Sequence, residues 1–208
     1  MAFGGTGNVF ELIRDGSIKG IATIIGCSSP KMSYEHNPVA IAARLIRDGV
    51  LVIATGCSAH ALLNAGLCSS DATIAVHPDL RAVCKNYGVP AVLAVGGCID
   101  NVRTLRLFTD IALAGGIRIH DMPYMVVCPE PGNEKSIGIG LAFLCHGISG
   151  ILGVSVPAKS DGSPTEMFSD YRLRETLGAA LYAETDPGRI SSLALKHLSE
   201  KRDISGWN

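Results

Sequence analysis

The chain has 208 residues, of which 47% are hydrophobic, and this length and composition are sufficient for one buried core. Its 18 basic and 19 acidic residues give a net charge of -1, which excludes the strong positive field typical of nucleic-acid-binding and anionic-lipid-binding proteins, so we expect no nucleic acid and no membrane as partner. Residues 1–8 contain neither the basic stretch nor the apolar stretch of a secretory signal, and we therefore expect a cytoplasmic protein.

Hydrophobic periodicity and turn residues predict that strands and helices alternate along the chain. The expected strands cover residues 19–25, 50–54, 91–95, 124–127, 150–154 and 180–183. The expected helices cover residues 9–14, 38–47, 59–65, 78–87, 101–113, 133–145, 165–177 and 187–201. Short strands that are apolar on both faces and separated by helices are typical of a parallel sheet covered on both sides. The sequence therefore predicts a single α/β domain over residues 1–208, with a doubly wound (Rossmann-like) parallel sheet.

Residues 137–156 form an uncharged stretch that raises the question of a membrane span. The stretch contains five glycines and His146, and it ends in a segment with the pattern of a strand. We therefore expect a buried helix followed by a strand.

Three of the seven cysteines share one local context, since each follows an apolar strand and a glycine and precedes a helical pattern. They are Cys27, Cys57 and Cys98. Any one of them alone is best explained as a small buried hydrophobic side chain. All three, however, fall at the carboxyl ends of strands, where open parallel sheets bind ligands and where a helix N-terminus favours the thiolate that binds metal. The shared context predicts one joint metal site.

The type of site follows from the spacing and from the lack of an export signal. An odd number of cysteines in a chain without a secretory signal favours reduced thiols over disulfides. The wide spacing of Cys27, Cys57 and Cys98 matches no zinc knuckle, whose ligands come in close pairs. A sulfide cluster or a mixed-metal centre fits this spacing better. Asp100 and Asn101 are expected to cap the helix that begins at Cys98.

Lys135 lies in the first turn of the helix expected over residues 133–145, where a cation opposes the helix dipole. Two interpretations remain open for it. It is either a surface lysine paired with Glu130 or Glu134, or a cationic donor directed at a bound anion or a developing carboxylate. The turn-rich loop of residues 157–164 is expected to form a rim of the same site.

The remaining cysteines and His60 are better explained as structural residues than as metal ligands. Cys68, Cys84 and Cys145 lie in or at the ends of expected helices and are predicted to pack in the core. Cys128 ends a strand near the expected site, but Pro follows it and no helix opens there, so we do not count it among the ligands. For His60, a partly buried structural histidine is favoured over a ligand.

Four motifs occur in a fixed order along the chain: Gly26-Cys-Ser-Ser-Pro-Lys31, Thr55-Gly-Cys-Ser-Ala59, Gly97-Cys-Ile-Asp-Asn101 with Arg103, and Glu134-Lys-Ser-Ile-Gly-Ile-Gly140. In this order they resemble the C-terminal domain of the anaerobic nickel–iron–sulfur carbon monoxide dehydrogenases, which belong to the prismane or hybrid-cluster-like superfamily. The resemblance extends along nearly the whole chain, and it implies an oxidoreductase that converts CO and water to CO2, two protons and two electrons.

The resemblance also implies roles for individual residues. Cys27 and Cys57 match cysteines that bind iron of the active-site cluster, and Cys98 matches one that binds nickel and an iron. Lys135 matches a lysine that assists turnover by hydrogen bonding and proton handling. The implied cofactor is a nickel–iron–sulfur cluster, here with the iron–sulfur part of the 4Fe-4S type, and the implied substrates are CO and CO2.

The chain is much shorter than the proteins that it resembles. They carry an N-terminal helical domain and a middle α/β domain that supply further cluster ligands, and residues 1–8 are rich in glycine where the family has an apolar strand. We therefore expect a partner chain that supplies the remaining ligands, an exposed apolar patch, and self-association as a dimer. Two alternatives stay open: a non-catalytic metal-binding or scaffold domain, and a hybrid-cluster (hydroxylamine reductase-like) protein, whose motifs fit less well.

Overall fold

A computed structural model describes residues 3–28, 33, 35–72, 74–130, 134–154, 165–166 and 171–207. Within them, seven strands form one sheet: β1 (Gly20–Ile24), β2 (Val50–Ala54), β3 (Val92–Ala94), β4 (Tyr124–Cys128), β5 (Gly150–Leu152), β6 (Thr165–Glu166) and β7 (Leu181–Ala183). Their order in the sheet is β3-β2-β1-β4-β5-β7-β6, and only β6 of these described strands runs antiparallel to its neighbour. The predicted parallel α/β fold is confirmed. The loop of residues 157–164, expected as a rim of the site, lies outside the described residues.

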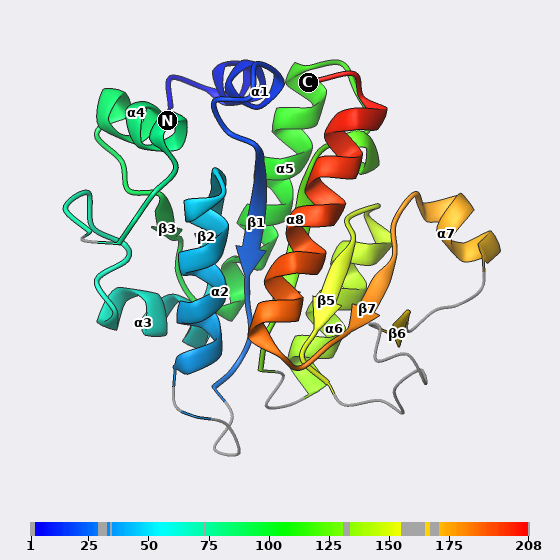
Figure 1. Cartoon of the computed structure of the whole chain (residues 1–208). Helices are drawn as coiled ribbons and strands as arrows, with labels where there is room; N and C mark the ends of the chain where they lie inside the picture. Colours follow the sequence, from blue (N-terminus) through cyan, green and yellow to red (C-terminus); the bar gives the residue numbers. More distant parts are fainter. Residues whose placement is uncertain are drawn as a thin grey trace.

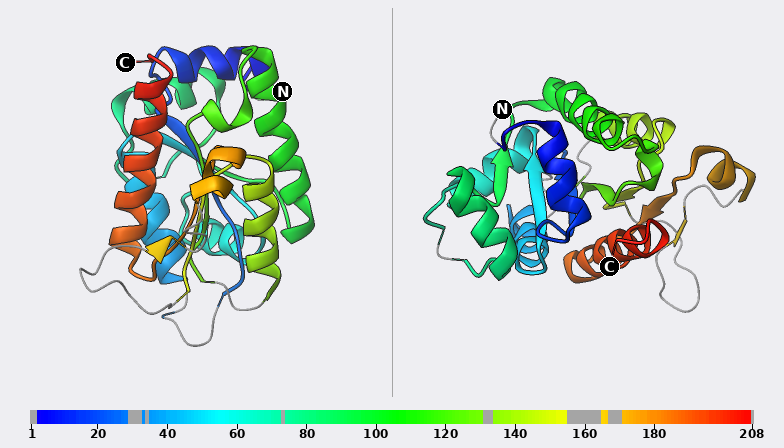
Figure 2. Two further views of the ribbon diagram at one scale, coloured as in Figure 1. Left: turned by 90° about the vertical axis from the view of Figure 1, so that its right-hand side faces the viewer. Right: turned by 90° about the horizontal axis from the view of Figure 1, so that it is seen from above.

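Helices cover both faces of the sheet (Figures 1 and 2). The described helices are α1 (Thr6–Arg14), α2 (His36–Arg47), α3 (Gly56–Asn64), α4 (Pro78–Tyr87), α5 (Asn101–Ala114), α6 (Glu134–Cys145), α7 (Tyr171–Leu177) and α8 (Pro187–Ile204), with short 3-10 turns η1 (Cys98–Asp100) and η2 (Ile119–Asp121). In Figure 1, α2 and α8 pack together in front of the sheet, and α5 and α6 lie behind it. Helix α1 packs on α5 at the end of the sheet where the strands begin.

The strand order reverses once along the parallel part of the sheet. From β1 the chain moves outward through β2 to β3, then returns and continues on the other side through β4, β5 and β7. Strands β1 and β4 are direct neighbours, so the reversal lies between them. Doubly wound sheets bind ligands in the crevice outside the carboxyl ends of the strands at such a reversal. The fold therefore directs attention to the loops after β1, β2, β3 and β4.

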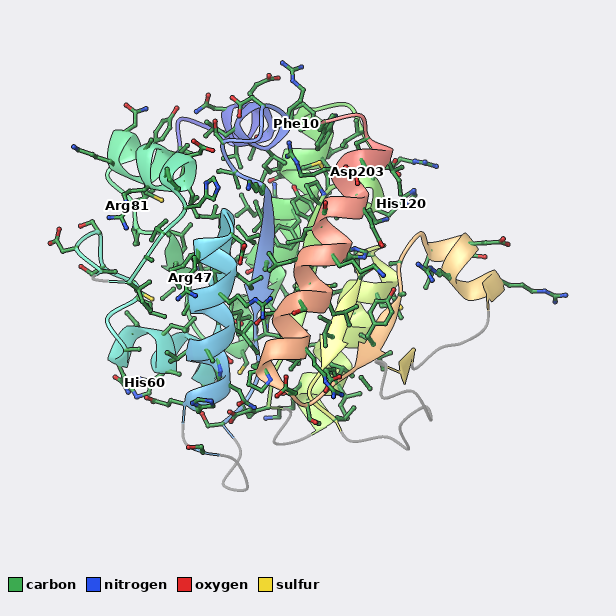
Figure 3. The ribbon with its side chains drawn as sticks, in the orientation of Figure 1. Phe10, Arg47, His60, Arg81, His120 and Asp203 are labelled. Carbon is green, nitrogen blue, oxygen red and sulfur yellow. The ribbon has the colours of Figure 1, made fainter. Side chains whose placement is uncertain are left out.

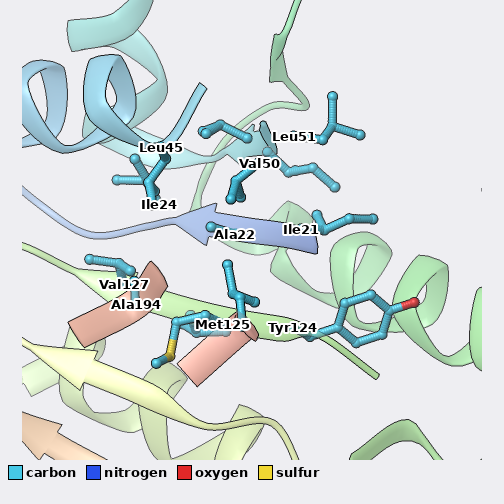
Figure 4. Close-up of a cluster of buried hydrophobic side chains, with 14 of the residues drawn as sticks. Ile21, Ala22, Ile24, Leu45, Val50, Leu51, Tyr124, Met125, Val127 and Ala194 are labelled. Atoms are coloured by element: carbon cyan, nitrogen blue, oxygen red, sulfur yellow. The ribbon is translucent and has the colours of Figure 1, made fainter. Parts of the chain in front are cut away.

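The central strands have apolar residues on both faces, and every residue of β1, β2 and β4 is buried. Figure 4 shows Ile21, Ala22 and Ile24 of β1 between Leu45 of α2 and Met125 of β4. Each fully buried large aliphatic side chain contributes roughly 1.5–3 kcal/mol to folding. This packing holds the strands rigidly, and the loops that leave their carboxyl ends therefore start from fixed positions.

One predicted element is wrong in part. Residues 165–177 were expected to form one helix, but Thr165 and Glu166 form β6, which pairs antiparallel with β7, and the helix is limited to Tyr171–Leu177. The backbone groups along the outer edge of β7 are satisfied by this pairing, and that tertiary hydrogen bonding outweighs the local pattern.

The uncharged stretch after residue 137 forms the rest of α6 and then β5, as predicted. Within the part of the chain that the structure describes, no helix has the length and apolar character needed to cross a membrane.

Candidate metal centre

The three cysteines singled out by the sequence lie in the loops at the carboxyl edge of the sheet, which is the lower end in Figure 1. Cys27 follows β1, Cys57 lies in the first turn of α3 directly after β2, and Cys98 begins η1 after β3. All three are free thiols; Cys57 and Cys98 are exposed and Cys27 is partly exposed. Rigid neighbouring strands thus carry three thiols to one edge of the molecule.

The loops after β2 and β3 are in direct contact. The backbone N–H of Gly56 donates a hydrogen bond to the carbonyl oxygen of Gly96 over 2.9 Å. Gly56 has φ +64°, and a Cβ atom added there would lie 2.8 Å from the Sγ of Cys98. Only glycine fits this close approach without moving the sulfur. The residue before Cys57 therefore makes room for the thiol of Cys98.

Side-chain hydrogen bonds fix the turn that presents Cys98. The amide nitrogen of Asn101 donates to the carbonyl oxygen of Cys98 over 2.8 Å, and the buried hydroxyl of Thr55 donates to the amide oxygen of Asn101 over 2.8 Å. The carboxylate of Asp100 accepts from the backbone N–H of Gly97 over 2.8 Å. The capping role expected for Asp100 is present only in the turn η1, since Asp100 makes no side-chain cap on α5. The capping role expected for Asn101 is wrong, because its side chain bonds to the Cys98 carbonyl and to Thr55 and to no helix N–H of the described residues. The sequence analysis missed Thr55, whose only signal is a hydroxyl residue at the end of an apolar strand.

The charges of the site residues affect one another. Burial and the charges of Cys27 and Cys57 raise the pKa of the Cys98 thiol, whereas the ammonium of Lys135 and a backbone hydrogen bond lower it. Lys135 is exposed, in the first turn of α6. The structure thus brings Lys135, Cys27 and Cys57 within electrostatic range of the Cys98 thiol. A bound metal cation would remove the repulsion between the thiolates.

Ser136 connects α6 to two of the cysteines. Its hydroxyl donates a hydrogen bond to the Sγ of Cys27 over 3.8 Å, and its carbonyl oxygen accepts one from the thiol of Cys128 over 3.4 Å. Cys128 is fully buried, and burial is the main cause that raises the pKa of its thiol. Cys128 therefore lies behind the exposed thiols as a protonated packing residue. Sequence reasoning missed Ser136, since only its position beside Lys135 indicates it.

The packing roles predicted for the other cysteines and the structural role predicted for His60 are confirmed only in part. Cys84 is buried, and burial raises the pKa of its thiol to about 11, as expected for core packing. Cys68 is only partly buried, and Cys145 is exposed at the end of α6, so the core prediction is wrong for Cys145 because it falls on the solvent side of the last turn. His60 was expected to be partly buried, but it is exposed near the lower end in Figure 3 and contacts the side chain of Asn64.

The distances between the possible ligand side chains decide which type of metal centre the site can hold. Among the described residues, no three histidine, cysteine or acidic side chains come close enough together to hold a single metal ion. A mononuclear zinc site therefore does not fit. A sulfide-bridged cluster takes cysteine thiolates on different metal atoms, so its ligands lie farther apart. Three free thiols on three neighbouring loops fit such a cluster.

The sequence matches one family model and a group of long relatives. Residues 5–188 match the model of the Prismane/CO dehydrogenase family. Carbon monoxide dehydrogenase 1 of Methanosarcina mazei is 33% identical over 200 residues, which cover 96% of this chain and 32% of that protein. Carbon monoxide dehydrogenase 1 of Carboxydothermus hydrogenoformans is 31% identical over 203 residues, which cover 93% of this chain and 32% of that protein. The chain thus spans about a third of the length of the relatives that it matches.

Solved structures show the same relationship. A Ni-free carbon monoxide dehydrogenase from Thermococcus sp. AM4 superposes with a TM-score of 0.86 at 32% identity, covering 96% of this chain and 32% of that one. Carbon monoxide dehydrogenase IV from Carboxydothermus hydrogenoformans superposes with a TM-score of 0.86 at 30% identity, covering 95% of this chain and 32% of that one. The fold, the order of the motifs and the match over most of its length lead to one conclusion: this chain belongs to the Prismane/CO dehydrogenase family.

Proposed function

We propose that this chain forms the part of a nickel–iron–sulfur carbon monoxide dehydrogenase that provides Cys27, Cys57 and Cys98 to the active-site cluster. The observation that carries the proposal is the convergence of three free thiols at the sheet edge, with Lys135 within electrostatic range of Cys98. The relatives and the structures cited above are named as carbon monoxide dehydrogenases. A further structure, which superposes with a TM-score of 0.84 at 25% identity, is described as an acetyl-CoA synthase/carbon monoxide dehydrogenase with NiZn[Fe4S4] and NiNi[Fe4S4] clusters in its alpha subunits.

Each residue has a defined task in this proposal. Cys27 and Cys57 would hold iron, and Cys98 would hold nickel and an iron. The cluster would supply redox-active metal for the conversion of CO and water to CO2, two protons and two electrons. Lys135 would place a cation within electrostatic range of Cys98, where it would stabilise negative charge that develops on the oxygens of the substrate and exchange a proton with it. Thr55 and Asn101 hold the turn that orients Cys98.

The proposal includes a partner. Three thiolates leave several metal atoms of such a cluster without protein ligands, and the relatives are about three times as long as this chain. A partner chain supplies the missing ligands and the clusters that carry electrons away. The proposal also places the chain in the cytoplasm under anaerobic conditions, because an odd number of cysteines favours reduced thiols over disulfides.

The second candidate is a non-catalytic metal-binding or scaffold domain. Among the described residues, no three histidine, cysteine or acidic side chains come close enough together to hold a metal ion by themselves, and this observation favours a domain without a complete metal site. A neighbouring gene that encodes the missing domains would favour the enzyme. The hybrid-cluster alternative has less support, because the relatives and structures described above are carbon monoxide dehydrogenases.

Anaerobic reconstitution with iron, sulfide and nickel tests the proposal. We expect the isolated chain to bind metal only in part and to oxidise CO far below the rate of complete enzymes, because the cluster lacks ligands. Metal analysis and a viologen-linked CO assay measure both quantities. Cys98→Ala should lose bound metal. Cys145 lies at the end of α6 that is far from Lys135, so Cys145→Ala should retain the metal.

Two results would contradict this account. Equal metal content in the wild-type chain and in Cys98→Ala would remove Cys98 from the ligand set. Robust CO oxidation by the isolated chain, lost in Cys98→Ala, would show that no partner is required. Metal binding without CO oxidation even after a partner has supplied the remaining ligands would favour the scaffold candidate.

A further inference from the structure

Ser136 lies at the point where α6 meets the cysteine-bearing edge of the sheet. It is the third residue of α6, directly after Lys135, and only 1% of it is exposed. Its hydroxyl donates to the Sγ of Cys27, and the buried thiol of Cys128 donates to its carbonyl oxygen. One serine thus joins a partly exposed thiol at the site to a buried thiol at the end of β4.

The surroundings of Ser136 leave room for this hydrogen bond. Gly26, which precedes Cys27, has φ +120°, and a Cβ atom added there would lie 3.4 Å from the Oγ of Ser136. The loop after β1 therefore passes close against the serine hydroxyl. A serine in the first turn of a helix usually bonds to the backbone of its own helix. Here the hydroxyl instead donates to a sulfur of a different element.

We propose that Ser136 is a positioning residue that holds the sulfur of Cys27 in its orientation toward the site. The meaning of this orientation rests on the proposed function, in which Cys27 is a cluster ligand. The hydrogen bond from Cys128 fixes the backbone of Ser136 from the core side, so the hydroxyl has a rigid base. Hydrogen bonds to ligand sulfurs withdraw electron density from them and raise the reduction potential of a cluster. Ser136 therefore positions Cys27 and also adjusts the electron density on its sulfur.

A double-mutant cycle on the metal-free chain tests the contact itself. A typical hydrogen bond changes the unfolding equilibrium constant by about fivefold. We expect Ser136→Ala to lower stability by about this factor in the wild-type background and by much less in a Cys27→Ala background. In a Cys145→Ala background, the effect of Ser136→Ala should remain undiminished, because Cys145 lies at the other end of α6.

An NMR experiment tests the orientation. In the 21.8 kDa chain with labelled cysteines, the side chain of Cys27 should show one χ1 rotamer in the wild type and rotamer averaging in Ser136→Ala, while Cys57 and Cys145 keep their signals. A general destabilisation of the fold by Ser136→Ala would change the signals of all three cysteines together. In a cluster assembled with the partner, Ser136→Ala should also have a lower midpoint potential.

The outcomes separate this inference from the proposed function. Additive effects in the cycle, or an unchanged Cys27 rotamer in Ser136→Ala, would overturn the role of Ser136. Coupling between Ser136 and Cys27 in a chain whose metal content does not depend on Cys27 would confirm the contact and overturn the ligand role of Cys27 instead.

Discussion

At the residue scale, Gly56 allows the loops after β2 and β3 to approach each other closely. Gly56→Ala should lose about 1–2 kcal/mol because φ is +64°, where alanine is unfavourable. It should lose about 1 kcal/mol more because the new Cβ atom displaces the sulfur of Cys98 from its rotamer. Urea unfolding of Gly56→Ala and of the wild type measures the sum of these two losses.

A matched control separates the two contributions. Gly66 has φ +72° and no heavy atom within 4 Å of an added Cβ, so Gly66→Ala should show only the backbone cost. In a Cys98→Ala background, Gly56→Ala should fall to the level of Gly66→Ala. Equal losses for the two glycines in the wild-type background would show that the sulfur of Cys98 does not contact Gly56.

His197 on α8 makes stability depend on pH. Burial is the main cause that lowers the pKa of His197 to about 3, and the charges of Lys201 and Arg174 add to it. The folded chain therefore keeps His197 neutral, whereas the unfolded chain binds a proton below its ordinary pKa of about 6.5. Stability is full above pH 6.5 and falls as the pH decreases toward 3. At pH 4.5 the loss from this residue amounts to about 2–3 kcal/mol.

Urea unfolding at pH 7 and pH 4.5 measures this effect. His197→Gln should lose about 2–3 kcal/mol less than the wild type between these two pH values. His146→Gln, at an exposed histidine after α6, should keep the pH dependence of the wild type. If His197→Gln also keeps the pH dependence of the wild type, His197 is not the cause of the pH-dependent loss of stability.

At the scale of elements, β2 and α5 are joined where they meet the site. The hydroxyl of Thr55, at the end of β2, and the side chain of Asn101, at the start of α5, are both buried and bonded to each other. Asn101→Ala removes the acceptor for Thr55 and the donor to the Cys98 carbonyl. Leaving a buried polar group unpaired costs about 1–3 kcal/mol. We expect a loss of free energy of unfolding in this range, measured by urea denaturation.

Asn64 at the end of α3 provides the comparison. Its side chain also makes hydrogen bonds, to Glu35 and His60, but these are exposed. Asn64→Ala should change stability by no more than about 0.5 kcal/mol, because water replaces the lost partners. Similar losses in Asn64→Ala and Asn101→Ala would argue against a special role for the buried pair.

At the scale of the whole molecule, apolar side chains lie on the surface beside the site. Ile99 is 89% exposed and lies in η1 directly after Cys98, and Val102 is 72% exposed and lies in the first turn of α5. Single exposed apolar residues are common, but these two neighbouring ones beside the site form the surface at which we predict a contact with another chain. We expect the chain to self-associate as a dimer at micromolar concentration, as sedimentation velocity would show.

Substitutions at both ends of the molecule identify the surface. Ile99→Ser with Val102→Ser should shift the chain toward the monomer, because these changes remove apolar area from the contact. Ile204, at the end of α8, is 76% exposed, and Ile204→Ser should leave the association unchanged. A wild-type chain that sediments only as a monomer would contradict the prediction.

The sequence by itself determined the type and approximate place of most elements, although it predicted one helix over residues 165–177, which contain β6 and α7. The strand at residues 50–54 and the helix at residues 78–87 have their predicted bounds, because apolar runs, proline and glycine act locally. It also predicted that Cys27, Cys57 and Cys98 follow parallel strands, since a repeated strand, glycine and cysteine pattern is legible without coordinates. Their assignment as ligands remains a prediction.

Only the tertiary structure decided which loops meet. The order β3-β2-β1-β4 brings the loop of Cys27 next to the loop of Cys128 and to Ser136, which lies 109 residues away along the chain. It also joins Thr55 to Asn101, pairs β6 with β7, and leaves Cys145 and His60 exposed. These features depend on contacts between distant segments. Local periodicity fixes the direction of a side chain relative to its own helix or strand, but the neighbouring element that it faces is set by how the elements pack.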